Sequence, residues 1–474
     1  MSDESAIDQL SDTPAEPAPR PRQRRRLVKR VLVSVTGAVV ALALLAVGGV
    51  YYLLNRGSEP QGPARLGPSP QLAPPNPEPI PKVNAPNVVG WPEGATPRAP
   101  EGFAVTAFAT NLDHPRWLYS LPNGDVLAAE AATPPKDPDS LGTRLLYWLR
   151  RNDGAVKDSA NRITLLRDTN GDGVADFRSA FLQNLNHPFG MAVVGDWFYV
   201  ANTDAVWRYR YKSGDTRITA PGEKILDLPA GGYNNHWTRN IMPSADGRSL
   251  YVTVGSGSNA GENGLAAEKR RAVVLQVDLD GRRERVVASG IRNPNGLGVE
   301  PSTGTPWTVV NERDVLGDDV APDYLTRVRP GDFYGWPWSY WGTHADDRVK
   351  PPRPDLVAKA VRPDYSLGAH TAPLGLAFST GTLFPEQYRG GAFIGEHGSW
   401  NRGNPVGYKV VYVPFEQGRP DGLPRDFLTG FRPDPKSDKT YGRPVGVIMD
   451  RAGGLLVADD AGNRVWRVAP ESRP

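Results

Sequence analysis

The segment RAGGLLVADDAGNRVWRV (451–468) decides the fold, because a glycine-containing turn is followed by two short apolar stretches. The same pattern recurs as PNGDVLAAE (122–130), VGDWFYVANTDAVWRYRY (194–211), ADGRSLYVTVGSGS (245–258), STGTPWTVVNERD (302–314) and YRGGAFIGEHGSW (388–400). Short valine- and aromatic-rich stretches between turns are typical of strands packed between neighbouring sheets. Six such units around a central channel predict an all-β fold, a six-bladed β-propeller.

The first and last strands expected in residues 101–474 fit a closed propeller. The segment GFAVTAFATNL (102–112) has the pattern of a strand, and we expect it to pair with the last blade and remove the open edges of the ring.

The composition of the chain excludes other architectures. It holds 51 Gly and 47 Pro among 474 residues, which disfavours long helices in residues 101–474. The absence of cysteine excludes disulfides, thiolate zinc sites and cysteine nucleophiles.

An uncharged apolar segment precedes the propeller. Residues 31–54 are long enough, as a helix, to cross a hydrocarbon core of roughly 30 Å. The arginine run in residues 1–30 predicts a cytoplasmic tail, so the chain after this membrane anchor is expected in the periplasm or outside the cell. A cleaved signal peptide is the alternative. Residues 55–100 contain 13 prolines and predict a semi-rigid linker.

The charge of the chain excludes one class of partner. The formal net charge is +3, and the N-terminal tail carries most of it. The propeller segment therefore has no strongly basic surface, and we predict no nucleic-acid binding.

Histidines and arginines occur in polar loops close to the repeated strands, where a propeller usually carries its function. His236 lies in GGYNNHWTRN (231–240), and an imidazole of near-neutral pKa suits proton abstraction from a hydroxyl. Arg292 and Asn293 form a rigid turn before a proline, and a guanidinium binds carboxylates with paired hydrogen bonds. Each has a structural alternative: a histidine fixed by hydrogen bonds, and an arginine that ties blades together.

Further basic residues follow in similar loops: His370 in LGAHTAPLG (367–375), Arg402 in GEHGSWNRGN (395–404) and Arg443 in YGRPVG (441–446). Several arginines around one channel mouth indicate a ligand with more than one negative charge. The motifs HPRW (114–117) and HPFG (187–190) are interpreted as turns that begin blades.

Two acidic segments predict calcium binding. The segment NERDVLGDDVAPDYL (311–325) crowds five carboxylates that a hard cation such as Ca²⁺ would neutralise, the alternative being a solvated acidic loop. In DTNGDGVAD (168–176), Asp168, Asn170, Asp172 and Asp176 have the spacing of a structural calcium loop. Ser179 stands where a complete EF-hand has a glutamate.

In this combination and order, the motifs resemble the soluble quinoprotein sugar dehydrogenases, specifically the sorbosone dehydrogenase-like branch. The resemblance covers about residues 101–470 and rests on NHWTRN, RNPNGL, NERD with DFYGWPW, GEHGSWNR and GRPVGVIMD. It implies a propeller that binds pyrroloquinoline quinone (PQQ) and Ca²⁺ at the channel mouth and oxidises a sugar or a sugar-derived aldehyde. It also implies that His236 takes a proton while hydride moves to the quinone, and that electrons pass to an acceptor.

The resemblance also assigns the other candidate residues. Glu130, Arg292, Asn293 and Arg443 match cofactor-binding positions, His370 stands where the family has a threonine, and Arg402 is the substitute for its lysine. Asp314 and Val315 stand where a Gly-Pro pair binds the cofactor's calcium through backbone carbonyls. Ser256 replaces the carboxylate that orients the histidine, and Val445 replaces a second arginine.

Two other classes of function stay open. A propeller without the cofactor would bind carbohydrate or a protein partner, and the changes at Ser256 and Val445 favour this alternative. A calcium-dependent hydrolase of the lactonase type would use acids around a central metal and would not need the arginines.

Overall fold

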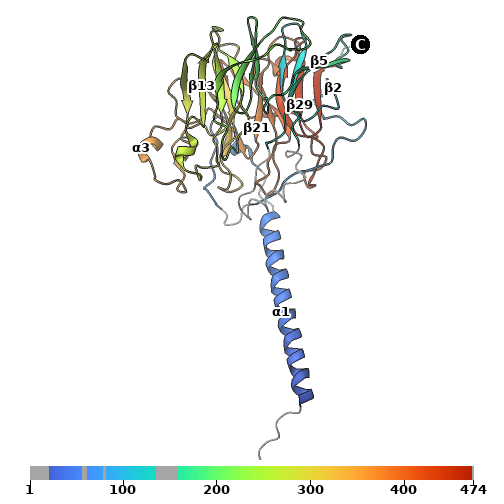
Figure 1. Cartoon of the computed structure of the whole chain (residues 1–474), viewed down its shortest axis with the longest axis vertical. Coiled ribbons are helices and arrows are strands. Elements are labelled where there is room, and N and C mark those ends of the chain that lie inside the picture. The colour runs from blue at the N-terminus through green and yellow to red at the C-terminus, as the bar shows by residue number, and fades with distance from the viewer. Residues whose placement is uncertain (1–20, 56–60, 78–81, 135–157, 472–474) are drawn as a thin grey trace, which may run out of the picture. The chain divides into compact units, whose positions relative to one another are not determined.

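A computed structural model of the chain shows strands bundled in one body and a long N-terminal helix (Figure 1). Each of the six repeated segments contains the second strand of a four-stranded antiparallel blade. The structure describes residues 21–55, 61–77, 82–134 and 158–471. The first strands of successive blades contact one another in a closed ring. The prediction of a six-bladed β-propeller is therefore confirmed.

The blades follow one another along the chain. Blades 1 to 3 consist of β3 (Pro115–Ser120), β4 (Val126–Glu130), β5 (Arg162–Arg167) and β6 (Phe177–Leu182); β7 (Met191–Val194), β8 (Trp197–Ala201), β9 (Ala205–Arg210) and β10 (Glu223–Asp227); and β11 (Ile241–Pro243), β12 (Ser249–Val254), β13 (Val273–Asp278) and β14 (Glu284–Ser289). Blades 4 and 5 consist of β15 (Pro294–Val299), β16 (Pro306–Val310), β17 (Pro322–Arg327) and β20 (Tyr365–Ala369); and β21 (Pro373–Phe378), β22 (Ala392–Glu396), β23 (Lys409–Val413) and β26 (Arg425–Leu428).

Blade 6 joins the two ends of the propeller. It consists of β28 (Pro444–Met449), β29 (Leu455–Asp459), β30 (Arg464–Pro470) and β2 (Phe103–Ala109). Strand β2 pairs antiparallel with β30, so that Val105 lies opposite Val468. The predicted pairing of the opening strand with the last blade is therefore confirmed, and both ends of the propeller are held in one blade.

Small residues allow the first strands to approach one another closely around the channel. A Pro-x-Gly sequence begins three of these strands, at Pro294, Pro373 and Pro444. A Cβ atom on Gly296 would lie 2.7 Å from the backbone nitrogen of Leu376, and one on Gly375 would lie 2.2 Å from the carbonyl oxygen of Val445. Glycine at these positions therefore fixes how tightly neighbouring blades pack.

Apolar side chains fill the spaces between blades and part of the channel. Trp117, Phe181 and Phe198 belong to one buried cluster between blades 1 and 2. The channel also holds a cavity of about 290 Å³, lined by the first strands of the blades and by residues that include Met191, Met242 and Met449. This lining is mostly apolar, in contrast to the loops at the opposite end of the first strands.

The N-terminal helix α1 (Pro21–Asn55) is a single helix (Figure 1). Its stretch Lys29–Gly49 has a mean hydropathy of 2.5 and is long enough to cross a membrane. The helix begins before the predicted residue 31, and residues 1–20 of the predicted tail lie outside the described residues. Residues 1–54 form one compact unit and residues 55–474 another.

The proline-rich segment differs from the predicted linker, because its described residues lie against the propeller. Gly67 forms a β-bridge with Ser366, and Arg98 forms one with Thr429. The Trp91 ring packs 4.9 Å from that of Trp466. Interspersed apolar and hydrogen-bonding residues thus attach this segment to blades 4, 5 and 6, and a boundary at residue 101 is not a structural boundary.

Short elements complete the described part of the chain. They are η1 (Pro63–Arg65), η2 (Leu265–Glu268), α3 (Pro354–Val357), η3 (Glu386–Tyr388) and the paired strands β1 (Asn87–Val88) with β27 (Lys439–Thr440), β18 (Ser339–Tyr340) with β19 (His344–Ala345), and β24 (Phe415–Glu416) with β25 (Arg419–Pro420).

Candidate functional site at the channel mouth

The predicted catalytic and cofactor-binding residues gather at one end of the propeller, whereas the predicted calcium loop 168–176, between β5 and β6, lies at the other end. In an antiparallel blade, the loop before the first strand and the loop between the second and third strands lie at the same end. His236, Arg292, His370 and Arg443 come from loops of the first kind, in blades 3 to 6. Asp314, Val315 and Arg402 come from loops of the second kind, in blades 4 and 5. We call this end the mouth.

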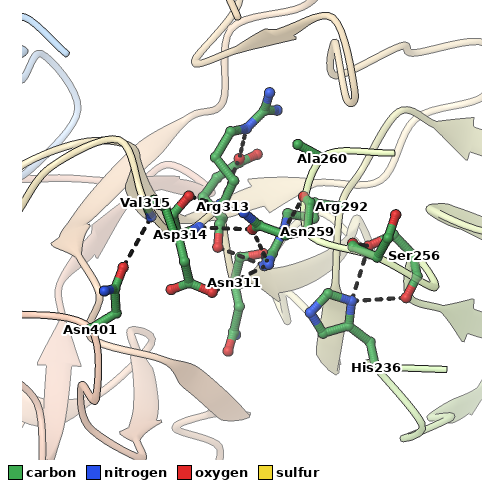
Figure 2. Close-up of polar contacts among 12 residues, drawn as sticks. His236, Ser256, Asn259, Ala260, Arg292, Asn311, Arg313, Asp314, Val315 and Asn401 are labelled. Atoms are coloured by element: carbon green, nitrogen blue, oxygen red, sulfur yellow. Dashed lines mark hydrogen bonds and ion pairs between the residues drawn. The ribbon is translucent and has the colours of Figure 1, made fainter. Parts of the chain in front are cut away.

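The imidazole of His236 has a defined orientation. Its Nδ1 lies 2.8 Å from the carbonyl oxygen and 3.0 Å from the Oγ of Ser256 (Figure 2). The Ser256 hydroxyl donates to the carbonyl of Ser258. Both Ser256 oxygens therefore accept from Nδ1–H, which makes Nε2 the basic atom of the ring. Ser256 thus occupies the place that the resemblance implied, with a neutral group instead of a carboxylate.

Asn293 lies beside this histidine. A Cβ atom on Gly255 would lie 2.5 Å from the Asn293 Oδ1 and 2.7 Å from the His236 Cβ, so only glycine lets the two side chains share this space. The Asn293 Oδ1 is buried and has no hydrogen-bond partner within the described residues. A ligand bound here would supply the hydrogen-bond donor that this buried amide oxygen lacks.

Arg292 is 1% exposed, and protein groups accept its hydrogen bonds. Its Nε donates to the carbonyl of Asn259, and its Nη1 donates to the carbonyls of Asn311 and Glu312. Its Nη2 donates to the Asn259 Oδ1 and lies 3.5 Å from the Asp314 Oδ2 (Figure 2). Burial lowers the pKa of Arg292, although Asp314 and Glu312 oppose the shift. The guanidinium therefore ties loops of blades 3 and 4 together.

The predicted calcium-binding segment is fixed by its neighbours. The Asp314 backbone N–H donates to the Asn259 Oδ1, and the Asp314 Oδ1 lies 3.5 Å from the His370 Nδ1. His370 Nε2 lies 3.0 Å from the carbonyl oxygen of Gly317. Burial lowers the pKa of His370, but Asp314 and Gly317 outweigh it, so the net shift is upward. His370 is thus held between two acceptors.

No group of three or more His, Asp or Glu side chains is arranged to hold a metal ion among the residues that the structure describes. In the loop between β5 and β6, Asp168 accepts from the N–H groups of Gly171 and Gly173, and Asp172 accepts from Asn170. Asp176 accepts from Thr169. Calcium at this loop, as at Asp314 and Val315, stays a prediction.

Three other predicted cofactor-binding residues also have protein partners. Arg402 donates to the carbonyl of Asp318 and to the Asp319 carboxylate. Arg443 donates to the carbonyls of His397 and Gly398. Glu130 is fully buried and accepts from Arg162 and Thr164. In this structure these side chains stabilise loops of the mouth.

Sequence reasoning missed Arg116 and Asp460. The Arg116 Nη1 donates to the Asp460 Oδ2 over 2.6 Å, and His397 Nε2 lies 3.0 Å from the same oxygen. Burial raises the pKa of Asp460, but His397, His114 and Arg116 lower it to well below its usual range. The HPRW motif had suggested only a turn. A basic residue occurs at the start of nearly every blade, and this regularity could have pointed to Arg116 in blade 1.

Arg116 also lies close to the other basic groups of the mouth. Its guanidinium is 5.5 Å from the ring of Trp237, the neighbour of His236 in the chain. Its Nε is buried and has no partner in the described part of the chain. Val445, which replaces an arginine of the resembled family, is fully buried in an apolar cluster with Trp117 and Phe189.

Two models of protein families match the chain. The model of a domain of unknown function, DUF7133, matches residues 100–399, and a TrAA12-like model matches residues 356–471. The chain belongs to the DUF7133 family.

Relatives of this DUF7133 protein include quinoproteins. It is 27% identical over 385 residues to an uncharacterised protein of Borreliella burgdorferi, with 79% of this chain and 91% of that protein covered. It is 26% identical over 274 residues to a PQQ-dependent pyranose dehydrogenase of Coprinopsis cinerea, with 48% and 36% covered. Other relatives are a PQQ-dependent sugar dehydrogenase of Hypocrea jecorina and an aldose sugar dehydrogenase of Escherichia coli, so the predicted resemblance to the quinoprotein sugar dehydrogenases is confirmed, without a sorbosone branch being specified.

The fold is also found in solved structures. The holo form of the PQQ domain of the Coprinopsis cinerea pyranose dehydrogenase has a TM-score of 0.63 and 20% identity, with 81% of this chain and 99% of that chain covered.

The mouth of the DUF7133 protein fits an anionic ligand beside His236. The resembled family binds PQQ, which carries three carboxylates. The Arg116 Nε is buried at the mouth without a partner among the described residues, and a carboxylate of a ligand would accept its hydrogen bond. The Asn293 amide oxygen, buried and also without a partner there, would accept from an N–H or O–H group of the ligand. The Trp237 ring, next to His236 in the chain, packs against the Arg116 guanidinium at 5.5 Å and is buried.

Proposed function

We propose that this protein is a PQQ-dependent dehydrogenase that oxidises a sugar or a sugar-derived aldehyde. One observation carries the proposal: His236 has its Nδ1–H fixed by Ser256 and lies beside the amide oxygen of Asn293, which has no partner among the described residues, at the mouth of a six-bladed propeller. The pyranose and aldose dehydrogenases among the relatives support the class of cofactor and substrate.

The protein's own groups would divide the chemistry as follows. Bound PQQ supplies the hydride acceptor. His236 Nε2 takes the proton from the substrate hydroxyl, while Nδ1–H donates to Ser256 before and after the transfer. Ser256 is neutral, so it orients the ring without compensating the positive charge that the ring acquires.

We assign cofactor binding to Asn293 and Arg116, and calcium binding to Asp314 and Val315. Arg292, Arg402, Arg443, His370 and Glu130 then act indirectly, because their side chains fix the loops of the mouth. Helix α1 would anchor the protein in a membrane, with the propeller in the periplasm or outside the cell. The electrons would pass to an acceptor that reaches the mouth.

The proposal is tested by titrating the chelator-treated full chain, in detergent, with PQQ in the presence and absence of Ca²⁺. We expect saturable, calcium-dependent quenching of tryptophan fluorescence. A panel of aldoses and aldehydes with a dye acceptor then identifies the substrate. Absence of PQQ binding at micromolar concentrations would refute the proposal.

A second function is favoured by the same contacts. The guanidinium groups of Arg292, Arg402 and Arg443 donate to protein acceptors, as expected of a propeller that binds carbohydrate or a protein partner without a cofactor. Sugar binding without PQQ binding in the titration would support this alternative.

A further inference from the structure

Residues 82–91, which we call the strap, precede the propeller in the chain and lie against the loops of its mouth. The Lys82 Nζ lies 2.7 Å from the Asp318 Oδ2, and the two side chains are only 7% and 9% exposed. Ion pairs on a protein surface contribute little, whereas breaking a buried pair leaves an uncompensated charge. The strap is therefore attached to the loop 314–319 by a strong contact.

A second connection runs from the strap to the predicted calcium-binding residue Val315. The Asn401 Nδ2 donates to the carbonyl of Lys82 over 2.6 Å. The Asn401 Oδ1 accepts from the Val315 backbone N–H over 3.0 Å (Figure 2). One amide side chain thus joins the strap to the loop. Val315 has φ of +68°, a backbone conformation that a β-branched residue rarely adopts unless its surroundings impose it.

The strap also fixes the loop that carries Asn401. The Asn84 Nδ2 donates to the carbonyl of Gly403, and the Asn84 backbone N–H donates to the carbonyl of Trp400, both over 2.8 Å. Further along, Trp91 Nε1 donates to the Asp459 Oδ2 over 2.6 Å, which attaches the strap to blade 6. Both ends of the strap are thus held on the propeller.

We propose that the strap is a structural part of the binding mouth, in which Lys82 positions the loop 314–319 and Asn84 positions residues 400–403, the segment that carries Asn401. Lys82 holds Asp318 directly, and the Lys82 carbonyl holds Val315 through Asn401. The effect on ligand binding rests on the proposed function, whereas the effect on the loop does not. Residues 101–474 alone would form the blades without this side of the mouth.

The test is hydrogen exchange of residues 311–321 in the full chain carrying Lys82→Met. We expect exchange in this loop, including the Val315 N–H, to become at least about tenfold faster, and Lys82→Arg to restore slow exchange. The control is Lys224→Met, which removes the pair between Lys224 and Asp227, 46% and 75% exposed, on β10. Unchanged exchange in Lys82→Met would overturn the inference.

Two further measurements keep the result decisive. Should Lys82→Met fail to fold, Asn84→Ala removes a single side-chain hydrogen bond and is expected to speed exchange in residues 400–403, with unchanged exchange overturning the inference. In PQQ titrations, Lys82→Met is expected to weaken calcium-dependent affinity about tenfold. A wild-type protein that binds no PQQ, with the exchange effect intact, would refute the proposed function and leave the positioning role of the strap supported.

Discussion

Replacing Arg292 with methionine separates a ligand-binding arginine from one that ties loops together. Methionine keeps part of the volume but leaves the carbonyls of Asn259, Asn311 and Glu312 without their donor. Each buried acceptor left unsatisfied costs about 1–3 kcal/mol. The variant also avoids the cost of burying the guanidinium, which offsets part of the loss from the three carbonyls. Breaking buried charged contacts typically costs about 3–5 kcal/mol, and we expect the free energy of unfolding to fall by about 3–5 kcal/mol.

The assay is urea unfolding of residues 55–474, which form a compact unit, followed by tryptophan fluorescence without cofactor. The matched control is Arg270→Met, because Arg270 pairs with Glu284 at 2.6 Å but the side chains are 37% and 27% exposed. An exposed pair of this kind contributes at most about 1 kcal/mol. If Arg292→Met were as stable as the control and only PQQ affinity fell, the loop-tying role of Arg292 would be refuted.

Three further predictions follow from the same contacts. His236→Ala should abolish turnover while PQQ affinity stays within about tenfold, and retained turnover would exclude His236 as the base. Burial raises the pKa of Glu396 to about 8, with Lys409 opposing it, so the native state holds a proton that the unfolded state releases. Stability contributed by Glu396 therefore falls as pH rises from about 4.5 to 8, by at most about 1.4 kcal/mol per pH unit, and Glu396→Gln should flatten this slope in urea titrations at several pH values. Deletion of residues 1–55 should give a protein that stays in the supernatant after ultracentrifugation without detergent, and sedimentation with membranes would indicate a second attachment.

The fold was predictable because its signals are local. A glycine turn followed by an apolar strand specifies the second strand of each blade, and these segments became β4, β8, β12, β16, β22 and β29. The closing pair of β2 and β30 was predictable because a propeller needs a partner for its last edge. The position of the site was predictable for a related reason, since loops before first strands share one end of the ring.

The partners of the site residues were not predictable in this way. An arginine before a proline has the same local sequence whether it binds a ligand or protein carbonyls. The partner of Arg292 is Asn259, which lies in a loop of another blade. The partner of Lys82 is Asp318, which lies far along the chain. Local sequence does not reveal such partners. Proline content suggested a linker because composition does not reveal that Trp91 finds an aromatic partner in Trp466.

The contacts at the mouth also bear on how the site would select a ligand. Most of its charged groups are paired within the protein: Arg292 with Asp314, Arg402 with Asp319, and Lys82 with Asp318. Paired and buried groups are costly to displace, so a ligand would enter a preformed site rather than reorganise these loops. Recognition would then depend on groups such as the Asn293 amide oxygen and the Arg116 Nε, which have no hydrogen-bond partner among the described residues. Because the strap holds the loops 314–319 and 400–403 of the mouth, a change in the strap would alter affinity without altering the chemistry at His236.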